Sequence, residues 1–77
     1  MDSDYVFITL VKESKSIDLK VPSFIPVKEL IDLFSEALNF HLGNQTKIQA
    51  EPLGRILDND KSIAEQKITQ GSILTLI

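Results

Sequence analysis

One segment of this 77-residue chain has helical periodicity, and β-favouring segments lie on both sides of it. In residues 27–40, VKELIDLFSEALNF, apolar side chains recur three and four positions apart and charged side chains fill the opposite side. Pro26 suits the first turn of such a helix, where its missing N–H is not needed, and Gly43 with Asn44 predicts the stop. The apolar stripe consists of Val27, Leu30, Ile31, Phe34 and Leu38, with Ala37 at its border.

The residues before the helix predict a β-hairpin. Residues 5–11, YVFITLV, are β-branched and aromatic, which is typical of a strand. Residues 17–21, IDLKV, alternate between apolar and charged side chains, so a second strand should have one buried and one wet face. The polar residues 12–16 between them are expected to form the turn.

Shorter elements are predicted after the helix. Residues 46–51 favour a strand, residues 52–55 (PLGR) a tight turn, and Ile56-Leu57 a very short strand. Residues 58–68 indicate a loop with a single helical turn, anchored by Ile63 and Ile68. The closing strand, residues 72–77 (SILTLI), follows a turn at Gln70-Gly71.

This order predicts an α+β fold in one domain, residues 1–77, with a mixed sheet of four to five strands packed on one main helix. The order is β-β-α-β-β-(turn)-β. Because one helix connects two strands of the same sheet, those strands should run parallel, with the first and last strands side by side in the middle. The apolar residues of SILTLI are then expected to serve the core.

Composition excludes several classes of function. The formal net charge is -3 and the eight basic residues are scattered, so the chain is not expected to bind nucleic acid. It has no cysteine, which excludes disulfides and thiolate metal sites. Its N-terminus is acidic, and no apolar run reaches membrane-spanning length, so a cytoplasmic protein without direct membrane insertion is expected.

The sequence contains no convincing catalytic or metal-binding set. His41 is the only histidine, and Asp58-Asn59-Asp60 lacks the glycine and acidic ligands that a calcium loop needs next. Glu29, Asp32 and Glu36 form an acidic stripe that is expected to face water. We therefore predict no catalytic, cofactor-binding or metal-binding residue, and no enzyme activity.

Two surfaces are candidates for binding another protein. If Val6, Ile8 and Leu10 face the core, then Tyr5, Phe7, Thr9 and Val11 face outward, and exposed aromatic side chains on a sheet are suited to docking. The reversed register would make Phe7 a core residue. The second candidate is Phe24-Ile25 before the helix, for which the alternative is a hydrophobic staple that fixes the start of the helix.

The β-grasp plan has this order of elements, and the chain resembles ubiquitin-like proteins along nearly its whole length. The resemblance rests on IDLKV, KIQAEPLGRIL, DNDKSI and ITQGSILTLI. The stretches VPSFIPVKELIDL and GSILTLI are similar to the YukD/EsaB-like group, which is associated with the ESX- or Ess-type (type VII) secretion systems of Gram-positive bacteria. This resemblance implies a protein-binding module, an accessory or regulatory component that docks to other secretion components.

Two departures from ubiquitin bear on that role. Modifiers and sulfur carriers of this fold need a flexible tail ending in Gly-Gly, whereas Ile77 directly follows a strand here, so conjugation is not expected. The positions of ubiquitin's apolar patch fall near Glu51, Thr75 and Ile77, with the glutamate at the centre. The alternatives are a carrier or modifier that works with an activating enzyme, or the cytosolic domain of a membrane-embedded secretion subunit. Met1 slightly favours an independent protein.

Overall fold

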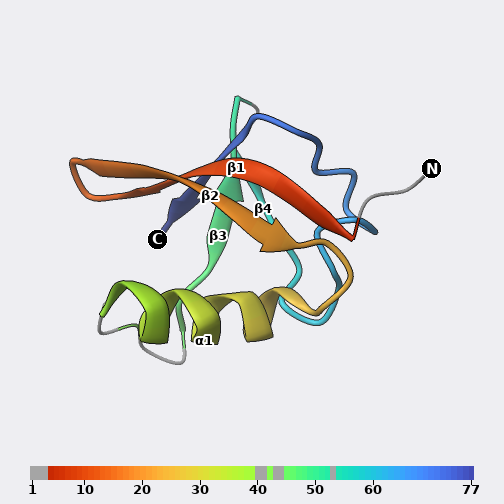
Figure 1. Cartoon of the computed structure of the whole chain (residues 1–77), viewed down its shortest axis with the longest axis horizontal. Helices are drawn as coiled ribbons and strands as arrows, with labels where there is room; N and C mark the ends of the chain where they lie inside the picture. The colour runs from red at the N-terminus through yellow and green to blue at the C-terminus, as the bar shows by residue number, and fades with distance from the viewer. Residues whose placement is uncertain (1–3, 40–41, 43–44, 53) are drawn as a thin grey trace.

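The structure is a computed structural model of the chain, and it describes residues 4–39, 42, 45–52 and 54–77. The elements are β1 Tyr5–Lys12, β2 Lys15–Pro22, α1 Val27–Leu38, β3 Ile48–Ala50, β4 Arg55–Ile56 and β5 Ser72–Leu76. The strands form one sheet in the order β2-β1-β5-β3-β4, and α1 lies across one face of it (Figure 1). The predicted architecture, one helix packed on a mixed sheet in an α+β fold, is confirmed.

The first and last strands lie side by side at the centre of the sheet. They run parallel, with Ile8 beside Ser72 and Leu10 beside Leu74. β2 is antiparallel to β1, and β3 is antiparallel to β5, so the two strands that α1 connects point the same way. This confirms the central position of the closing strand and the parallel direction of the connected strands.

The alternation of side chains along β1 decides which of them face the helix. Val6, Ile8 and Leu10 are buried, with exposed fractions of 6%, 2% and 1%. Phe7 is exposed on the other face. The register with Val6 inward is therefore confirmed, and the reversed register, which would bury Phe7, is wrong.

The closing strand divides its apolar residues between the two faces of the sheet. Leu74 and Leu76 are buried in the core, whereas Ile73 and Ile77 are exposed. Successive side chains of a strand point to opposite faces, so only every second residue of SILTLI can reach the core. The expectation that all of its apolar residues serve the core is wrong for Ile73 and Ile77.

The core lies between α1 and the sheet, and most of the predicted helical stripe belongs to it. Leu38 is half-buried, and Ala37, at the border of the stripe, is exposed. The buried apolar side chains form one cluster: Val6, Ile8, Leu10, Val21, Val27, Leu30, Ile31, Phe34, Ile48, Ala50, Leu57, Ile63, Leu74 and Leu76.

The N-terminal end of α1 is capped by the backbone of a distant segment. Pro26 is the N-cap residue, one position before its expected place, and no side chain caps the helix there. The N–H of Val27 instead donates to the carbonyl of Lys61 at 2.9 Å, and the N–H of Lys28 donates to the carbonyl of Asn59 at 3.0 Å. Free N–H groups at a helix start need partners, and the segment after β4 supplies them here.

The C-terminal end of α1 comes two residues earlier than predicted. The helix ends at Leu38, and Asn39 has a left-handed conformation with φ 56°. Asparagine tolerates this conformation better than most residues and therefore ends helices. Gly43 and Asn44, which were expected to stop the helix, lie outside the described residues.

The hairpin turn is tighter than the predicted segment 12–16. Lys12 pairs with Lys15, which leaves a loop of only Glu13 and Ser14. The backbone ladder therefore includes the polar residues Lys15 and Ser16, which come before the apolar alternation begins at Ile17. Glu13 has φ 58°, a region that costs a residue with a Cβ free energy.

The two short strands after the helix are displaced from their predicted bounds. β3 covers only Ile48–Ala50, and β4 begins at Arg55. Leu57 lies just beyond β4, where its N–H donates to the carbonyl of Ile48 at 2.8 Å and its side chain is buried. Pro52, which follows a cis peptide bond, has no N–H with which to continue the ladder.

The predicted helical turn within residues 58–68 is held by a reciprocal capping box. The N–H of Glu65 donates to Ser62 Oγ at 3.1 Å, and the N–H of Ser62 donates to Glu65 Oε1 at 3.0 Å. Ile63, between them, is buried as predicted, and Ile68 packs partly buried against the core. The capping pattern Ser-x-x-Glu is readable in the sequence, although it was not among the features identified there.

Replacing Glu13 with glycine should stabilise the protein by about 1 kcal/mol, because glycine adopts a positive φ without steric cost. The surface ion pair between Lys12 and Glu13 is lost, but exposed pairs contribute little. Urea denaturation would measure the gain. Ser14→Gly is the matched control, since Ser14 is not among the described residues with positive φ, and it should not stabilise. Equal effects of both substitutions would contradict this account of the turn.

Ser62→Ala should lower the free energy of unfolding by about 1 kcal/mol, since it removes the acceptor for the N–H of Glu65. Thermal denaturation should show the midpoint falling by about 4–8 °C in a domain of this size. Glu65→Gln keeps an acceptor oxygen in the same place and should change the midpoint much less. A midpoint for Ser62→Ala that matches wild type would show that the capping box does not stabilise this turn.

Candidate partner-binding surface

The five residues predicted to bind a partner fall into two groups. Tyr5, Phe7 and Phe24 are exposed, with exposed fractions of 48%, 58% and 56%. Thr9 and Ile25 are half-buried. Exposed apolar side chains that lie together can mark an interaction site, so the first group is the stronger candidate for binding a partner.

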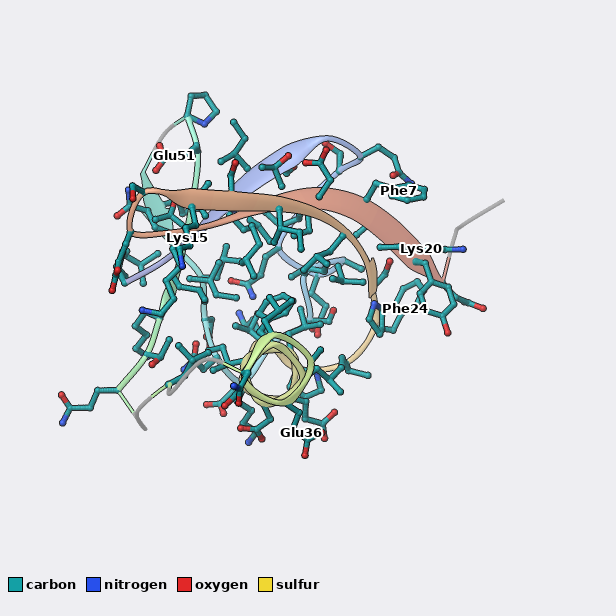
Figure 2. The ribbon with its side chains drawn as sticks, turned by 60° about the vertical axis from the view of Figure 1, so that its left-hand side comes forward. Phe7, Lys15, Lys20, Phe24, Glu36 and Glu51 are labelled. Atoms are coloured by element: carbon teal, nitrogen blue, oxygen red, sulfur yellow. The ribbon has the colours of Figure 1, made fainter. Side chains whose placement is uncertain are left out.

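Backbone contacts gather the three aromatic side chains at one end of the sheet. Tyr5 and Phe7 alternate outward from the start of β1. The N–H of Ser23 donates to the carbonyl of Asp4 at 2.8 Å, which holds the residue before Phe24 against the start of β1. Figure 2 shows Phe7 and Phe24 at the same end of the molecule. We call Tyr5, Phe7 and Phe24 the aromatic end.

A lysine lies within the aromatic end. Lys20 on β2 is directly opposite Phe7 in the sheet, and its Nζ lies 5.2 Å from the centroid of the Tyr5 ring. This distance allows a cation–π interaction. Figure 2 shows Lys20 between Phe7 and Phe24, so the apolar surface includes one positive charge. Sequence reasoning assigned Lys20 only to the wet face of its strand.

The aromatic end borders a groove of about 650 Å³. Tyr5 and Phe24 line it together with residues 64–65 and 67–70, whereas Phe7 is not among the lining residues. Residues 64–70 are brought there by the hydrogen bond from the N–H of Ala64 to the carbonyl of Ser23, at 3.1 Å. Local sequence patterns do not reveal this contact, because it joins segments some forty positions apart. The groove adds a concave surface beside exposed rings.

Thr9 and Ile25, which are half-buried, make contacts within the fold. Thr9 Oγ1 donates to Asp18 Oδ1 at 2.7 Å, across the β1–β2 pair. Ile25 precedes the N-cap Pro26 and packs partly buried against the core cluster that contains Leu30. Its place before the N-cap and Leu30 in the second turn are the positions of a hydrophobic staple, so the alternative weighed for Phe24-Ile25 fits Ile25 but not Phe24.

Of the positions compared with ubiquitin's apolar patch, Ile77 is exposed, and Glu51 and Thr75 are half-buried. The centre is different from the one expected, because Gln49 is the residue opposite Thr75. Glu51 instead lies next to Ile73, to whose carbonyl its N–H donates at 2.9 Å. Gln49 Nε2 donates to Glu51 Oε1 at 2.8 Å. The middle of this surface is therefore a hydrogen-bonded polar pair.

The acidic side chains of residues 58–60 form a hydrogen bond and an ion pair within the chain. Asp58 Oδ1 accepts the N–H of Asp60 at 2.9 Å, and Asp60 Oδ1 lies 3.3 Å from Lys28 Nζ. Gln66 bonds to both backbone groups of Asp58, at 2.7 and 3.0 Å, and so closes the loop on itself. His41 lies outside the described residues.

Among residues 4–39, 42, 45–52 and 54–77, no group of three or more histidine, cysteine, aspartate or glutamate side chains could hold a metal ion. Within the same residues, no helix combines the length and apolarity needed to cross a bilayer.

Comparison with solved structures shows a ubiquitin-like fold. The ubiquitin-like domain of the Mycobacterium tuberculosis type VII secretion system protein EccD1 is 24% identical, with a TM-score of 0.71, over 95% of this chain and 97% of that one. Caldiarchaeum subterraneum ubiquitin is 16% identical, with a TM-score of 0.75, over 95% and 91%. A protein designed on the basis of ubiquitin is 21% identical, with a TM-score of 0.79, over 99% and 90%.

Comparison with curated protein sequences gave no match. A family profile described as "WXG100 protein secretion system (Wss), protein YukD" matches residues 5–76. The match extends from the first residue of β1 to the last residue of β5, so it includes every strand and the helix. The chain belongs to the YukD family of the WXG100 secretion system.

Proposed function

We propose that this chain is a cytosolic protein-binding module, an accessory or regulatory component of a type VII secretion system that is not conjugated to other proteins. The observation that carries the proposal is the aromatic end, where Tyr5, Phe7 and Phe24 are exposed beside a groove. It acts by docking to other protein components of the secretion machinery. It has no enzyme activity, cofactor or nucleic-acid partner in this proposal.

The aromatic end has the properties of a docking surface. Tyr5 and Phe7 are fixed on a strand in the sheet, so their backbone loses little freedom when a partner binds. Aromatic rings bury a large area for few rotatable bonds, and they dominate the binding energy of many interfaces. Lys20 adds a charge that can interact with an acidic group of the partner.

Membership of the YukD family supports the secretion-system partner. The EccD1 domain, which has the same fold, belongs to a type VII secretion system protein. We propose that components of such a machine are what the aromatic end binds. Association with membrane complexes would then occur through these protein partners.

The proposal that Ile77 is not conjugated rests on its hydrogen bonds. The N–H of Ile77 donates to the carbonyl of Lys47 at 2.9 Å, and the N–H of Lys47 donates to the carbonyl of Ile77 at 3.1 Å. These bonds hold Ile77 against the sheet beside β3. An activating enzyme would have to break both of them before the residue could enter a narrow catalytic channel.

Phe7→Asp and Phe24→Asp should each abolish capture of secretion components from the cytosol and membrane fraction of the bacterium that encodes the protein. A central aromatic side chain is expected to contribute about 2 kcal/mol or more to binding. The measurement is an affinity pull-down in which mass spectrometry identifies the bound proteins. Ile56→Asp is the matched control, because Ile56 is also exposed but lies on β4, far from β1 in the sheet.

Circular dichroism must show that each variant folds. Secretion components retained equally by all four proteins would contradict the assignment to the aromatic end. Intact mass of the protein recovered from cells tests the rival function, a carrier or modifier that works with an activating enzyme. A covalent adduct at Ile77 would contradict the non-conjugated module.

A further inference from the structure

The strand β2 forms one edge of the sheet, and half of its backbone groups point away from β1. Residue pairs of an antiparallel ladder alternate between hydrogen-bonded and non-hydrogen-bonded. Phe7 uses its N–H and its carbonyl on the β5 side, with Gln70 Oε1 at 2.8 Å and the N–H of Gly71 at 2.8 Å. Its opposite residue, Lys20, must therefore direct its own N–H and carbonyl toward the open edge. By the same alternation, Asp18 also directs its N–H and carbonyl toward the open edge.

From this edge we infer that the protein forms a symmetric dimer, in which β2 pairs antiparallel with β2 of a second copy about a twofold axis through Leu19. The inference goes beyond the proposed function, because it concerns the open edge of β2 and a second copy of the chain; Lys20 is the one residue that this edge shares with the surroundings of the aromatic end. The two sheets join into one continuous sheet across the axis.

Charge favours this register over its neighbours. Asp18 and Lys20 are exposed and opposite in sign. An axis through Leu19 places Asp18 of each copy opposite Lys20 of the other, so two pairs of opposite charges form on the same face. An axis through Asp18 or through Lys20 would instead set like charges against each other. Charges on an edge strand usually prevent pairing, but their order here permits it in one register.

Apolar side chains on the helix side of β2 favour the same register. Ile17 is 43% exposed although it belongs to the inward-facing set, and Leu19 is half-buried. An axis through Leu19 places the two Leu19 side chains together and Ile17 opposite Val21 of the other copy. Val21 borders a groove of about 410 Å³ between β2 and α1, which Leu33 also lines. Exposed Ile17 would thus cover one side of the groove of the second copy.

Sedimentation equilibrium of the full chain, over a wide range of protomer concentration, tests the dimer. The average mass should rise from 8.6 kDa toward twice that value as concentration increases. Asp18→Lys and Lys20→Asp should each weaken association about tenfold or more, because like charges then meet across the axis. An equimolar mixture of these two variants should regain association, and so should the double variant D18K/K20D.

The charge exchange separates a dimer interface from a folding defect. Asp18→Lys also removes the bond from Thr9, but the double variant lacks that bond too and is still expected to associate. A wild type that stays at 8.6 kDa at every concentration overturns the dimer. The dimer is also overturned if the single charge reversals leave association unchanged, or if the mixture of the two variants does not restore it. Protection of β2 amides from hydrogen exchange only after a secretion component is added would assign the edge to that component and overturn the pairing of two copies.

Discussion

The rest of the structure depends on the parallel pairing of β1 with β5. It joins segments more than sixty positions apart in the chain, with Ile8 beside Ser72 and Leu10 beside Leu74. Ile8, Leu10 and Leu74 on these two strands are almost fully buried, and they form the floor against which α1 packs. β2 pairs only with β1, and β3 and β4 reach the sheet through β5, so the β1–β5 pair joins the N-terminal hairpin to the strands after the helix in one sheet.

The elements of this fold were more predictable from the sequence than their boundaries. Periodicity predicted the helix and the strand at residues 17–21, because burial on one face leaves a repeat of 3.6 or of two residues. The other strands were predicted from β-favouring residues bounded by turn signals. Boundaries were less predictable where the polar backbone continues beyond the core, as at Lys15, or where a residue such as Asn39 ends a helix early. Ile73 was placed in the core because an apolar residue in a strand does not by itself indicate its face.

The candidate binding surface could be predicted only in part. Tyr5 and Phe7 followed from the alternation of β1, and Phe24 followed from its position before the helix. The groove beside them could not be predicted, since it exists only when residues 64–70 are brought against Ser23. The place of Lys20 above the Tyr5 ring depends on the hairpin register. Contacts between distant segments leave no periodic signal in a single sequence.

The backbone cap on α1 affects how this family can vary. The N–H groups of Val27 and Lys28 donate to the backbone carbonyls of Lys61 and Asn59, not to their side chains. The identity of Lys61 can therefore change without loss of the cap, since every residue has a carbonyl. The number of residues between Asp58 and Ser62 cannot change so freely, because one insertion or deletion would carry the carbonyls away from the helix. Relatives should thus preserve the length of this loop more strictly than its sequence.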